Sequence, residues 1–389
     1  MLLLTNEDVK HVLTMEKCLE AVEESTRRVG RGQLSKWDAG RLLTAQGGFG
    51  GGASSYVLRL RPLFDMVDEV AILRINSWAT AEVEVFGALR NMGVAISGDR
   101  NPHNSEKSGW LLLFDMRTGK LLSIVQDRDM QVMRVGAVGG LCAKYMAKPD
   151  ASKIGLIGSG WMARSLLMGH SLVRNIKSVK VFSSTPANRT AYCEQMRGPV
   201  GIEDITPVSS AEEAVRGADI VISATNSIGA TFDPAWLAPG AHVYCVTGAE
   251  YDERMLQRAD RIAWTYPASD QYDAKADATK ATGDPQKDKI EARKHGEAGY
   301  RVASWRLLEM FNSKRVYLTD FIEGRAPGRN NDQEITFSPS PAAGSSTAIR
   351  FAALLPMVVN MAKQANVGHD LPDDWFQQET ETYQMYTLK

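Results

Sequence analysis

The sequence predicts an α/β protein, a doubly wound parallel sheet joined to an α+β domain, on three observations. An apolar run at 154–157 leads into Gly158-Ser159-Gly160, and a helical pattern follows from Trp161. Extended and helical patterns then alternate as far as Trp264, which is typical of a parallel sheet. Before residue 126 the extended runs include a hairpin signal at 116–120, which is typical of an antiparallel sheet.

Length and composition are those of an ordinary globular protein. The chain has 389 residues, of which 44% are hydrophobic and 23% charged, enough for two domains with their own cores. Its 45 Lys+Arg balance 46 Asp+Glu, so we expect no nucleic-acid partner. No apolar run approaches the ~18 residues that a membrane span needs, so we also expect no membrane partner.

Cysteine and histidine usage favours a reducing compartment and no metal. The four cysteines are scattered, and Cys142 and Cys245 lie in apolar runs, as expected for small buried side chains in the cytoplasm. Met1-Leu-Leu-Leu4 is too short for a signal peptide, so the predicted location is cytoplasmic. The six histidines show no metal-ligand spacing, so no metal site is predicted.

The N-terminal part is predicted to hold one helix and then strands. Thr14 is expected to cap a helix that ends near Gly30. The glycine cluster at 47–52 predicts a flexible loop. Extended runs are found at 41–44, 56–60, 70–76, 110–115 and 121–125. A long helix over 129–147, stopped by Pro149, then leads to the parallel sheet.

The second half alternates between strands and helices. Strands are expected at 153–157, 179–182, 219–224, 241–246 and 261–264, with helices at 161–174, 187–196 and 211–215. The polar stretch 268–298 is predicted to be a surface insertion. A buried helix at 348–362 is expected to return to the N-terminal domain, because the parallel sheet is by then complete. The predicted domains are 1–128 plus 330–389, and 129–329.

The glycine turn predicts a dinucleotide site. Gly158 allows a tight turn, and Gly160 lets the backbone approach a pyrophosphate at the helix N-terminus. Ala163 replaces the third glycine and still permits close packing. The expected cofactor contacts here are Gly158, Ser159, Gly160, Trp161 and Met162. The alternative is a plain turn in an α/β sheet.

The next strand end bears on the choice of cofactor. An NAD site usually has an acidic residue there to hold the ribose 2′-hydroxyl, but Ser183, Ser184 and Thr185 stand in its place. These hydroxyls, with Asn188 and Arg189, suit a 2′-phosphate, so NADP(H) is favoured and NAD(H) remains an alternative.

Two further strand ends carry polar residues. Ala224, Thr225, Asn226 and Ser227 follow the strand at 219–224 and are expected near the nicotinamide ribose, and Thr247 is expected to contact the cofactor after the following strand. The alternative for 224–227 is a polar turn at the end of a strand.

Several motifs in order connect the chain to a known family. They are Arg134-Val-Gly-Ala-Val-Gly-Gly-Leu-Cys-Ala-Lys-Tyr-Met-Ala147 leading to Ile157, Pro239-Gly-Ala-His-Val243 with Val246-Thr-Gly-Ala249, Gly324-Arg-Ala-Pro-Gly-Arg329 with Glu334-Ile-Thr-Phe337, and Leu113-Phe-Asp115 with Thr118-Gly119. With them the chain resembles the ornithine cyclodeaminase/μ-crystallin family over nearly its whole length, apart from the insertion. The resemblance implies a homodimer, a substrate domain made from both chain ends, a Rossmann domain and a small imino or amino acid substrate.

The resemblance also implies roles for three arginines. The family's counterpart of Arg134 lies between the substrate carboxylate and the cofactor phosphates, where a guanidinium fork suits either group. Arg74 stands where the family usually has a lysine near the substrate carboxylate and reacting carbon. Arginine practically cannot release a proton, so Arg74 is expected to clamp the carboxylate. Arg41 matches a carboxylate-binding arginine more loosely. The alternatives are a surface arginine for Arg134 and a structural ion pair for Arg74.

Glu250 is the expected acid and base. It follows Thr247-Gly-Ala249 after a parallel strand, where cyclodeaminases of the family have an aspartate that acts on the substrate nitrogen. The extra methylene moves the carboxyl by ~1.5 Å and changes the geometry of proton transfer. Asp252 is the fallback, and an exposed loop carboxylate is the alternative.

These features predict an NAD(P)H-dependent oxidoreductase acting on carbon–nitrogen bonds, which reduces an imine or ketimine of a small carboxylic acid or runs the reverse reaction. Arg74 and Glu250 are the expected catalytic residues, and Arg41, Arg74 and Arg134 the expected substrate contacts. An ornithine or lysine cyclodeaminase with recycled NAD⁺ is the alternative enzyme, less favoured because the chain departs from the family at Arg74 and Glu250. A non-enzymatic NADP-dependent binding protein is the third hypothesis.

Overall fold

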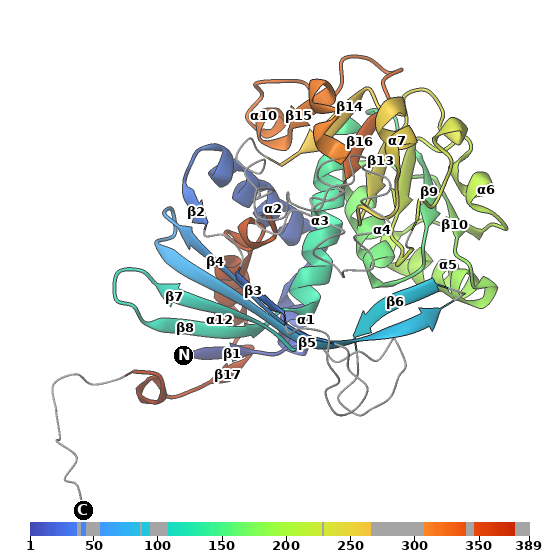
Figure 1. The fold of residues 1–389 in the computed structure, drawn as a ribbon. Coiled ribbons are helices and arrows are strands. Elements are labelled where there is room, and N and C mark those ends of the chain that lie inside the picture. Colours follow the sequence, from blue (N-terminus) through green and yellow to red (C-terminus); the bar gives the residue numbers. More distant parts are fainter. Residues whose placement is uncertain are drawn as a thin grey trace, which may run out of the picture.

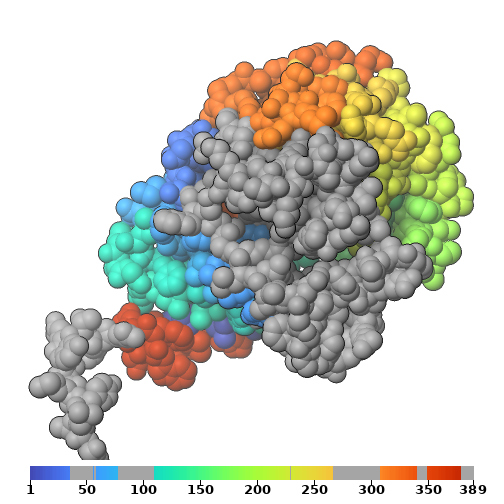
Figure 2. All heavy atoms as spheres, viewed as in Figure 1, coloured from blue at the N-terminus to red at the C-terminus, as the bar shows by residue number. Residues whose placement is uncertain are grey.

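The computed structural model describes residues 1–36, 40–43, 55–85, 88–93, 108–227, 229–265, 307–339 and 346–377. These residues form a nine-stranded and an eight-stranded sheet, with the long helix α3 (Arg128–Met146) between them (Figure 1). The space-filling view shows the blue and cyan N-terminal part beside the yellow and green part that holds the parallel sheet (Figure 2). The glycine cluster at 47–52 and the insertion at 268–298 lie outside the described residues.

The nine-stranded sheet contains strands from the N-terminal and the C-terminal part of the chain. Its strands are β1 (Leu2–Leu4), β2 (Leu34–Lys36), β3 (Gly40–Leu43), β4 (Ser55–Asp65), β5 (Val70–Val85), β6 (Ala88–Gly93), β7 (Ser108–Asp115), β8 (Leu121–Gln126) and β17 (His369–Asp370). All pairings are antiparallel except that of β1 with β8. Because β17 pairs with β1, strands from the N-terminal and the C-terminal part of the chain lie in one sheet.

The eight-stranded sheet is parallel throughout, in the order β11-β10-β9-β12-β13-β16-β14-β15. Its strands are β9 (Lys153–Ile157), β10 (Ser178–Phe182), β11 (Asp204–Pro207), β12 (Ile220–Ser223), β13 (His242–Cys245), β14 (Arg261–Trp264), β15 (Arg315–Tyr317) and β16 (Thr336–Pro339). The accompanying helices are α4 (Trp161–Val173), α5 (Pro186–Val200), α6 (Ala211–Val215), α7 (Glu253–Arg258) and α10 (Leu318–Ile322). The order around β9 confirms the doubly wound Rossmann fold.

The sequence suggested that the parallel sheet ends at Trp264. In the structure two later strands also belong to this sheet. Strand β16 lies between β13 and β14, and β15 forms the edge. The predicted boundary at 329 therefore divides the sheet domain, which extends through Pro339. With only 3 and 4 residues, β15 and β16 are too short for a clear periodic pattern.

The expected helix at 348–362 is two helices, α11 (Ser346–Ile349) and α12 (Leu354–Gln364). Pro356 stands in the first turn of α12. Proline has no N–H to donate to the carbonyl four residues earlier, so one continuous helix is disfavoured through this segment. The break places Arg350 and Phe351 between the two helices.

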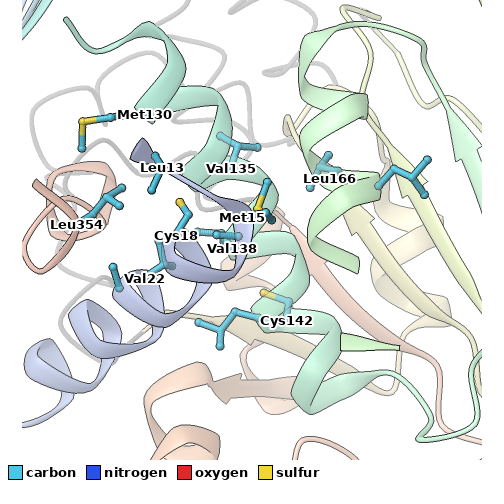
Figure 3. Close-up of a cluster of buried hydrophobic side chains, with 14 of the residues drawn as sticks. Leu13, Met15, Cys18, Val22, Met130, Val135, Val138, Cys142, Leu166 and Leu354 are labelled. Atoms are coloured by element: carbon cyan, nitrogen blue, oxygen red, sulfur yellow. The ribbon is translucent and has the colours of Figure 1, made fainter. Parts of the chain in front are cut away.

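Two helices, where the sequence predicted one, pack against α3. Helix α1 (Asn6–Val12) is followed by α2 (Met15–Gly30), whose cap residue Thr14 accepts from the Lys17 N–H. Met15, Cys18 and Val22 pack with side chains of α3 in one hydrophobic cluster (Figure 3). The four cysteines of the chain are free and buried.

Helices α3 and α4 approach each other through glycines. A Cβ on Gly140 would lie 2.4 Å from the Gly169 carbonyl oxygen, and one on Gly169 would lie 2.1 Å from that of Gly136. No side chain fits at that distance, so glycine is required for this packing. The contact holds Arg134, on α3, in a fixed relation to α4, which begins at the glycine turn.

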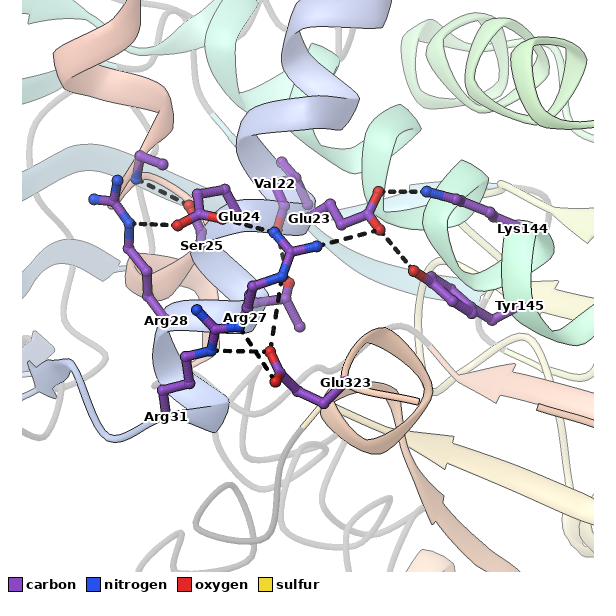
Figure 4. A network of polar contacts seen from close by, with 12 residues as sticks. Val22, Glu23, Glu24, Ser25, Arg27, Arg28, Arg31, Lys144, Tyr145 and Glu323 are labelled. Atoms are coloured by element: carbon purple, nitrogen blue, oxygen red, sulfur yellow. Dashed lines mark hydrogen bonds and ion pairs between the residues drawn. The ribbon is translucent and has the colours of Figure 1, made fainter. Parts of the chain in front are cut away.

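Ion pairs join the two domains along α2. The carboxylate of Glu323, after α10, forms ion pairs with Arg31 Nε at 3.1 Å and with Arg27 Nε at 3.7 Å. On the other side, the carboxylate of Glu23 accepts hydrogen bonds from Lys144 Nζ and the Tyr145 hydroxyl of α3, each at 2.6 Å (Figure 4). The network connects helices on both sides of the domain boundary.

Two histidines beside the parallel sheet are buried. His170 Nδ1 lies 2.7 Å from the Leu166 carbonyl oxygen, and His242 Nδ1 lies 2.9 Å from Thr336 Oγ1. Burial lowers the pKa of His170 to about 4, and it lowers the pKa of His242 well below its ordinary value. Both side chains are therefore neutral in the folded protein at pH 7.

We expect acid to destabilise the fold through His170. Below its ordinary pKa of 6.5 the unfolded chain binds a proton that the folded protein excludes down to about pH 4. Stability is therefore complete above pH 6.5 and falls toward pH 4. Urea unfolding should show about 2 kcal/mol less stability at pH 5 than at pH 7 from this residue. His170→Asn, which keeps a donor near Leu166 but cannot titrate, should reduce the difference, and an unchanged difference would contradict the assignment.

Candidate functional site

The predicted cofactor residues gather at one edge of the parallel sheet. The register pairs Ile157 with Phe182 and Ser223, and Ser223 with Cys245, so the carboxyl ends of β9, β10, β12 and β13 are neighbours. The residues that follow these ends are Gly158, Ser159, Gly160, Trp161, Met162, Ser183, Ser184, Thr185, Asn188, Arg189, Ala224, Thr225, Asn226, Ser227 and Thr247. Ligands of doubly wound sheets bind at this edge.

The glycine turn combines a backbone conformation that favours glycine with the N-terminus of α4. Gly158 has φ +113°, and a Cβ there would lie 2.2 Å from the Ala224 carbonyl oxygen. Gly160 precedes the first residue of α4, and, apart from its chain neighbours, no atom of the described residues lies within 4 Å of the position of a Cβ on it. The N-terminus of α4 is therefore open to an anion, which its N–H groups and dipole favour. Trp161 lies beside it and is 64% exposed.

The end of β10 presents hydroxyls and a guanidinium. Ser159 Oγ donates to Ser183 Oγ at 3.2 Å, which connects the glycine turn to this strand end. Arg189 Nη1 donates to the Ser183 carbonyl at 2.8 Å. Ser184, Thr185 and Asn188 are exposed, and the segment 183–189 has no acidic residue. The residues present therefore fit a phosphate as well as a ribose hydroxyl.

Arg74 is held by a carboxylate inside the N-terminal sheet. Its Nε and Nη2 each lie 2.7 Å from Asp127 Oδ2, and Asn76 Nδ2 donates to the same oxygen at 2.8 Å. Arg74 and Asp127 are both buried. A Cβ on Gly109 would lie 2.0 Å from Asp127 Oδ1, so the glycine makes room for this pair. The structural ion pair considered as an alternative for Arg74 is thus present.

Arg134 meets Arg74 at the ring of Phe351. The Arg74 guanidinium carbon lies 5.1 Å from the ring centroid and that of Arg134 5.9 Å. Burial, then the charges of Arg74 and Arg350, lower the pKa of Arg134 to about 9. Arg134 is half-buried, its Nε donates to Gln131 Oε1 at 3.2 Å, and it has no carboxylate partner among the described residues. This position suits an anionic ligand.

The strand β4 adds arginines that the sequence prediction did not include. Arg59 and Arg61 are buried, and the register pairs Arg61 with Arg74 across the strands. Their i, i+2 spacing in an extended run was the available signal, because it places both on one face. The register also pairs Arg41 with Arg59, but the Arg41 side chain lies outside the described residues. Asp127, Phe351 and Arg350 were missed as well, and no local pattern marks them.

Glu250 does not lie on an open surface as the predicted role requires. It is fully buried, and its carboxylate accepts hydrogen bonds from Ser223, Thr225 and Thr247. Burial raises its pKa, and these hydrogen bonds act in the opposite direction. No contact in the described part of the chain joins Glu250 to Arg74 or Arg134. The fallback, Asp252, caps α7 and pairs with Arg254 at 2.9 Å.

The described residues offer neither a metal site nor a membrane-spanning helix. Among them, no group of three or more His, Cys, Asp or Glu side chains is placed to hold a metal ion. No described helix is both long and apolar enough to span a membrane.

Known proteins resemble the chain in sequence and in structure. A family model, the ornithine cyclodeaminase/mu-crystallin family, matches residues 99–343. A Delta(1)-pyrroline-2-carboxylate reductase of Bacillus cereus is 26% identical over 238 residues, covering 60% of this chain and 66% of the reductase, just under two thirds.

Two solved structures share the fold over almost the whole chain. One is the Thermococcus litoralis Delta(1)-pyrroline-2-carboxylate reductase in complex with NADH and L-proline, with a TM-score of 0.70, 22% identity and coverage of 95% of this chain and 100% of that one. The other is an archaeal alanine dehydrogenase dimer with bound NAD, with a TM-score of 0.67, 21% identity and coverage of 96% and 99%. At these identities the likeness shows the fold.

Proposed function

Because this chain belongs to the ornithine cyclodeaminase/mu-crystallin family, we propose that it is an NAD(P)H-dependent oxidoreductase acting on carbon–nitrogen bonds. It reduces an imine or ketimine of a small carboxylic acid to the amino acid, or catalyses the reverse reaction. The observation that carries the proposal is that Arg134 and Arg74 both lie against the ring of Phe351. Arg134 belongs to α3, the helix that packs on α4. The related reductase that acts on pyrroline-2-carboxylate, an imine with a carboxylate, supports it.

The chain's own residues bind and orient the substrate. Arg134 and Arg74 hold the carboxylate with guanidinium forks, and the buried surroundings strengthen both contacts. Arg74 is paired with Asp127, and an arginine in this place stabilises charge and does not transfer a proton. The nicotinamide, when bound, would supply the hydride to the imine carbon, and water would supply the proton to the nitrogen. A cyclodeaminase is the alternative, and it lacks support because Arg74 cannot release a proton and Glu250 is enclosed.

One assay separates the three hypotheses. The protein is incubated with ornithine or lysine, and separately with cyclic and linear imines plus NADPH or NADH, while absorbance at 340 nm and ammonia are followed. Loss of reduced cofactor that depends on an imine supports the reductase. Ammonia release without net loss of cofactor favours the cyclodeaminase, and cofactor binding without turnover favours the binding protein.

For the cofactor, we propose a preference for NADPH. Ser183, Ser184, Thr185 and Arg189 surround the β10 end without an acidic neighbour in 183–189, which supports binding of a 2′-phosphate. Replacing Arg189 with glutamine is expected to weaken NADPH binding about tenfold, the value of one charge-assisted hydrogen bond, and to leave NADH binding unchanged. Fluorescence titration measures both, with the exposed Arg216→Gln as the control. Wild-type protein that binds NADH at least as tightly as NADPH would contradict the preference.

For assembly, we propose a homodimer formed through the outer face of the nine-stranded sheet. The half-buried side chains that alternate with the buried core positions are nearly all apolar there: Leu58, Leu60, Leu73, Ile75, Trp110, Leu112, Phe114, Leu122 and Ile124. The register pairs Leu73 with Leu112, and Leu112 with Ile124, so they form rows across the strands. A contiguous apolar face of this extent is typical of an interface. The related alanine dehydrogenase is a dimer, which supports a second copy as the partner.

Leu112→Arg is expected to give a monomer, because the change places a charge without a partner in the centre of that face. Sedimentation velocity at micromolar concentration measures the state, with Thr118→Arg in the exposed hairpin as the control. A monomeric wild-type protein, or a dimeric Leu112→Arg variant, would contradict the interface.

For location, the four free, buried cysteines support the proposed cytoplasmic compartment.

A further inference from the structure

Glu250 lies in a closed set of hydrogen-bond donors. Its Oε1 accepts from Ser223 Oγ at 3.0 Å, from Thr225 Oγ1 at 2.8 Å and from the Thr225 N–H. Its Oε2 accepts from the Thr247 N–H at 2.8 Å. The residue has no exposed surface. Four donors and full burial leave the carboxylate without access to a substrate nitrogen or to bulk water.

The donors come from the ends of two neighbouring strands. Ser223 is the last residue of β12, Thr225 follows it by two positions, and Thr247 follows the last residue of β13 by two. The register places Ser223 beside Cys245. Glu250 also holds the adjacent loop, because its carbonyl accepts from the Thr231 N–H at 3.1 Å. Glu250, through its carboxylate and its carbonyl, therefore connects the ends of β12 and β13 and the segment that follows β12.

The hydrogen-bonding pattern indicates the ionised form. Backbone N–H groups can only donate, so a protonated carboxyl that met Thr225 N–H and Thr247 N–H would have to direct its own proton elsewhere. A carboxylate accepts from all four donors at once. Burial raises the pKa of Glu250, and these four hydrogen bonds oppose that rise without a cation.

We propose that Glu250 is a positioning residue for the nicotinamide end of the cofactor, and not the acid that protonates the substrate. By holding Thr225 and Thr247 it shapes the two strand ends on which the nicotinamide ribose rests. The inference depends on the proposed function for the place of the cofactor. It predicts that a change at Glu250 acts on cofactor affinity, whereas loss of a catalytic acid would act on kcat and on the pH profile.

The test uses the full-length protein and two variants. Glu250→Gln keeps the shape but turns an NH₂ toward one of the N–H donors, and Ser223→Ala removes one donor at a site that has no exposed surface. Cofactor affinity is measured without substrate, by titrating NADPH and NADH against protein fluorescence. We expect Glu250→Gln to weaken the tighter cofactor about tenfold or more, and Ser223→Ala about threefold. Glu194→Gln, an exposed change on α5, should have no effect.

Turnover then separates positioning from acid catalysis. At saturating cofactor and imine, Glu250→Gln should keep kcat within about threefold of wild type, with the same pH profile. A kcat loss of about a hundredfold with unchanged cofactor affinity and a missing limb in the pH profile would overturn the inference. If Glu250→Gln does not fold, unchanged affinity in Ser223→Ala overturns it. Wild-type protein that binds neither cofactor would overturn the proposed function itself.

Discussion

Replacing Arg134 with methionine is expected to lower kcat/KM for the imine about a hundredfold or more and to raise the Tm of the free protein. The loss follows from two charge-assisted hydrogen bonds to the substrate carboxylate, worth about 1.5–3 kcal/mol each. The gain in stability follows from the lowered pKa of Arg134, about 9, which shows that burial, Arg74 and Arg350 disfavour its charged form in the fold.

The gain should be modest. Arg134 keeps part of its surface exposed, so we expect about 1–2 kcal/mol, well below what a lowering of the pKa to about 9 would imply for complete burial. Arg134→Lys keeps a charge but loses the planar fork, and should recover only part of the activity. Steady-state kinetics and thermal unfolding measure the two effects. A variant that loses Tm together with activity would show that Arg134 is structural.

Replacing Asp127 with asparagine is expected to lower the free energy of unfolding by about 3–5 kcal/mol, because it leaves the buried charge of Arg74 without its partner. The double variant Arg74→Met, Asp127→Asn should recover much of this loss, since it removes both charges. In the single variant, Arg74 should also lose its orientation, which raises KM for the imine more than it lowers kcat.

Urea unfolding of the two single variants and the double variant measures the coupling. Glu7→Gln breaks an exposed ion pair with Lys10 and is the matched control, expected to cost less than about 1 kcal/mol. If the Asp127→Asn variant is no less stable than that control, solvent compensates the charge of Arg74, and the ion pair with Asp127 does not stabilise it.

The glycine turn at the carboxyl end of the parallel sheet could be predicted from the sequence, because its geometry depends on neighbouring residues. The apolar run of β9, the positive φ at Gly158 and the helix from Trp161 depend on residues within a few positions of each other. The binding of a cofactor there remains a proposal. Short strands such as β15 and β16 lack that local pattern, so the predicted sheet and its boundary at 329 were incomplete.

The surroundings of Arg74 and Arg134 were harder to predict, because the residues that contact them are distant in the chain. Sequence motifs singled out Arg74 and Arg134, but the contact of both with Phe351 depends on a break between α11 and α12 that the predicted single helix did not contain. Glu250 was expected to be an exposed or catalytic carboxylate, and its position after Thr247-Gly-Ala249 does not reveal that the whole residue is buried.

The sequence by itself determined the family, the two kinds of sheet and the glycine turn, because periodicity and motifs of neighbouring residues specify them. Only the tertiary structure decided how the buried charges are compensated. Asp127 is 53 residues from Arg74 in the chain, and the donors to Glu250 come from two separate strands. A buried charge requires hydrogen-bonding partners, and packing selects which groups of the chain supply them.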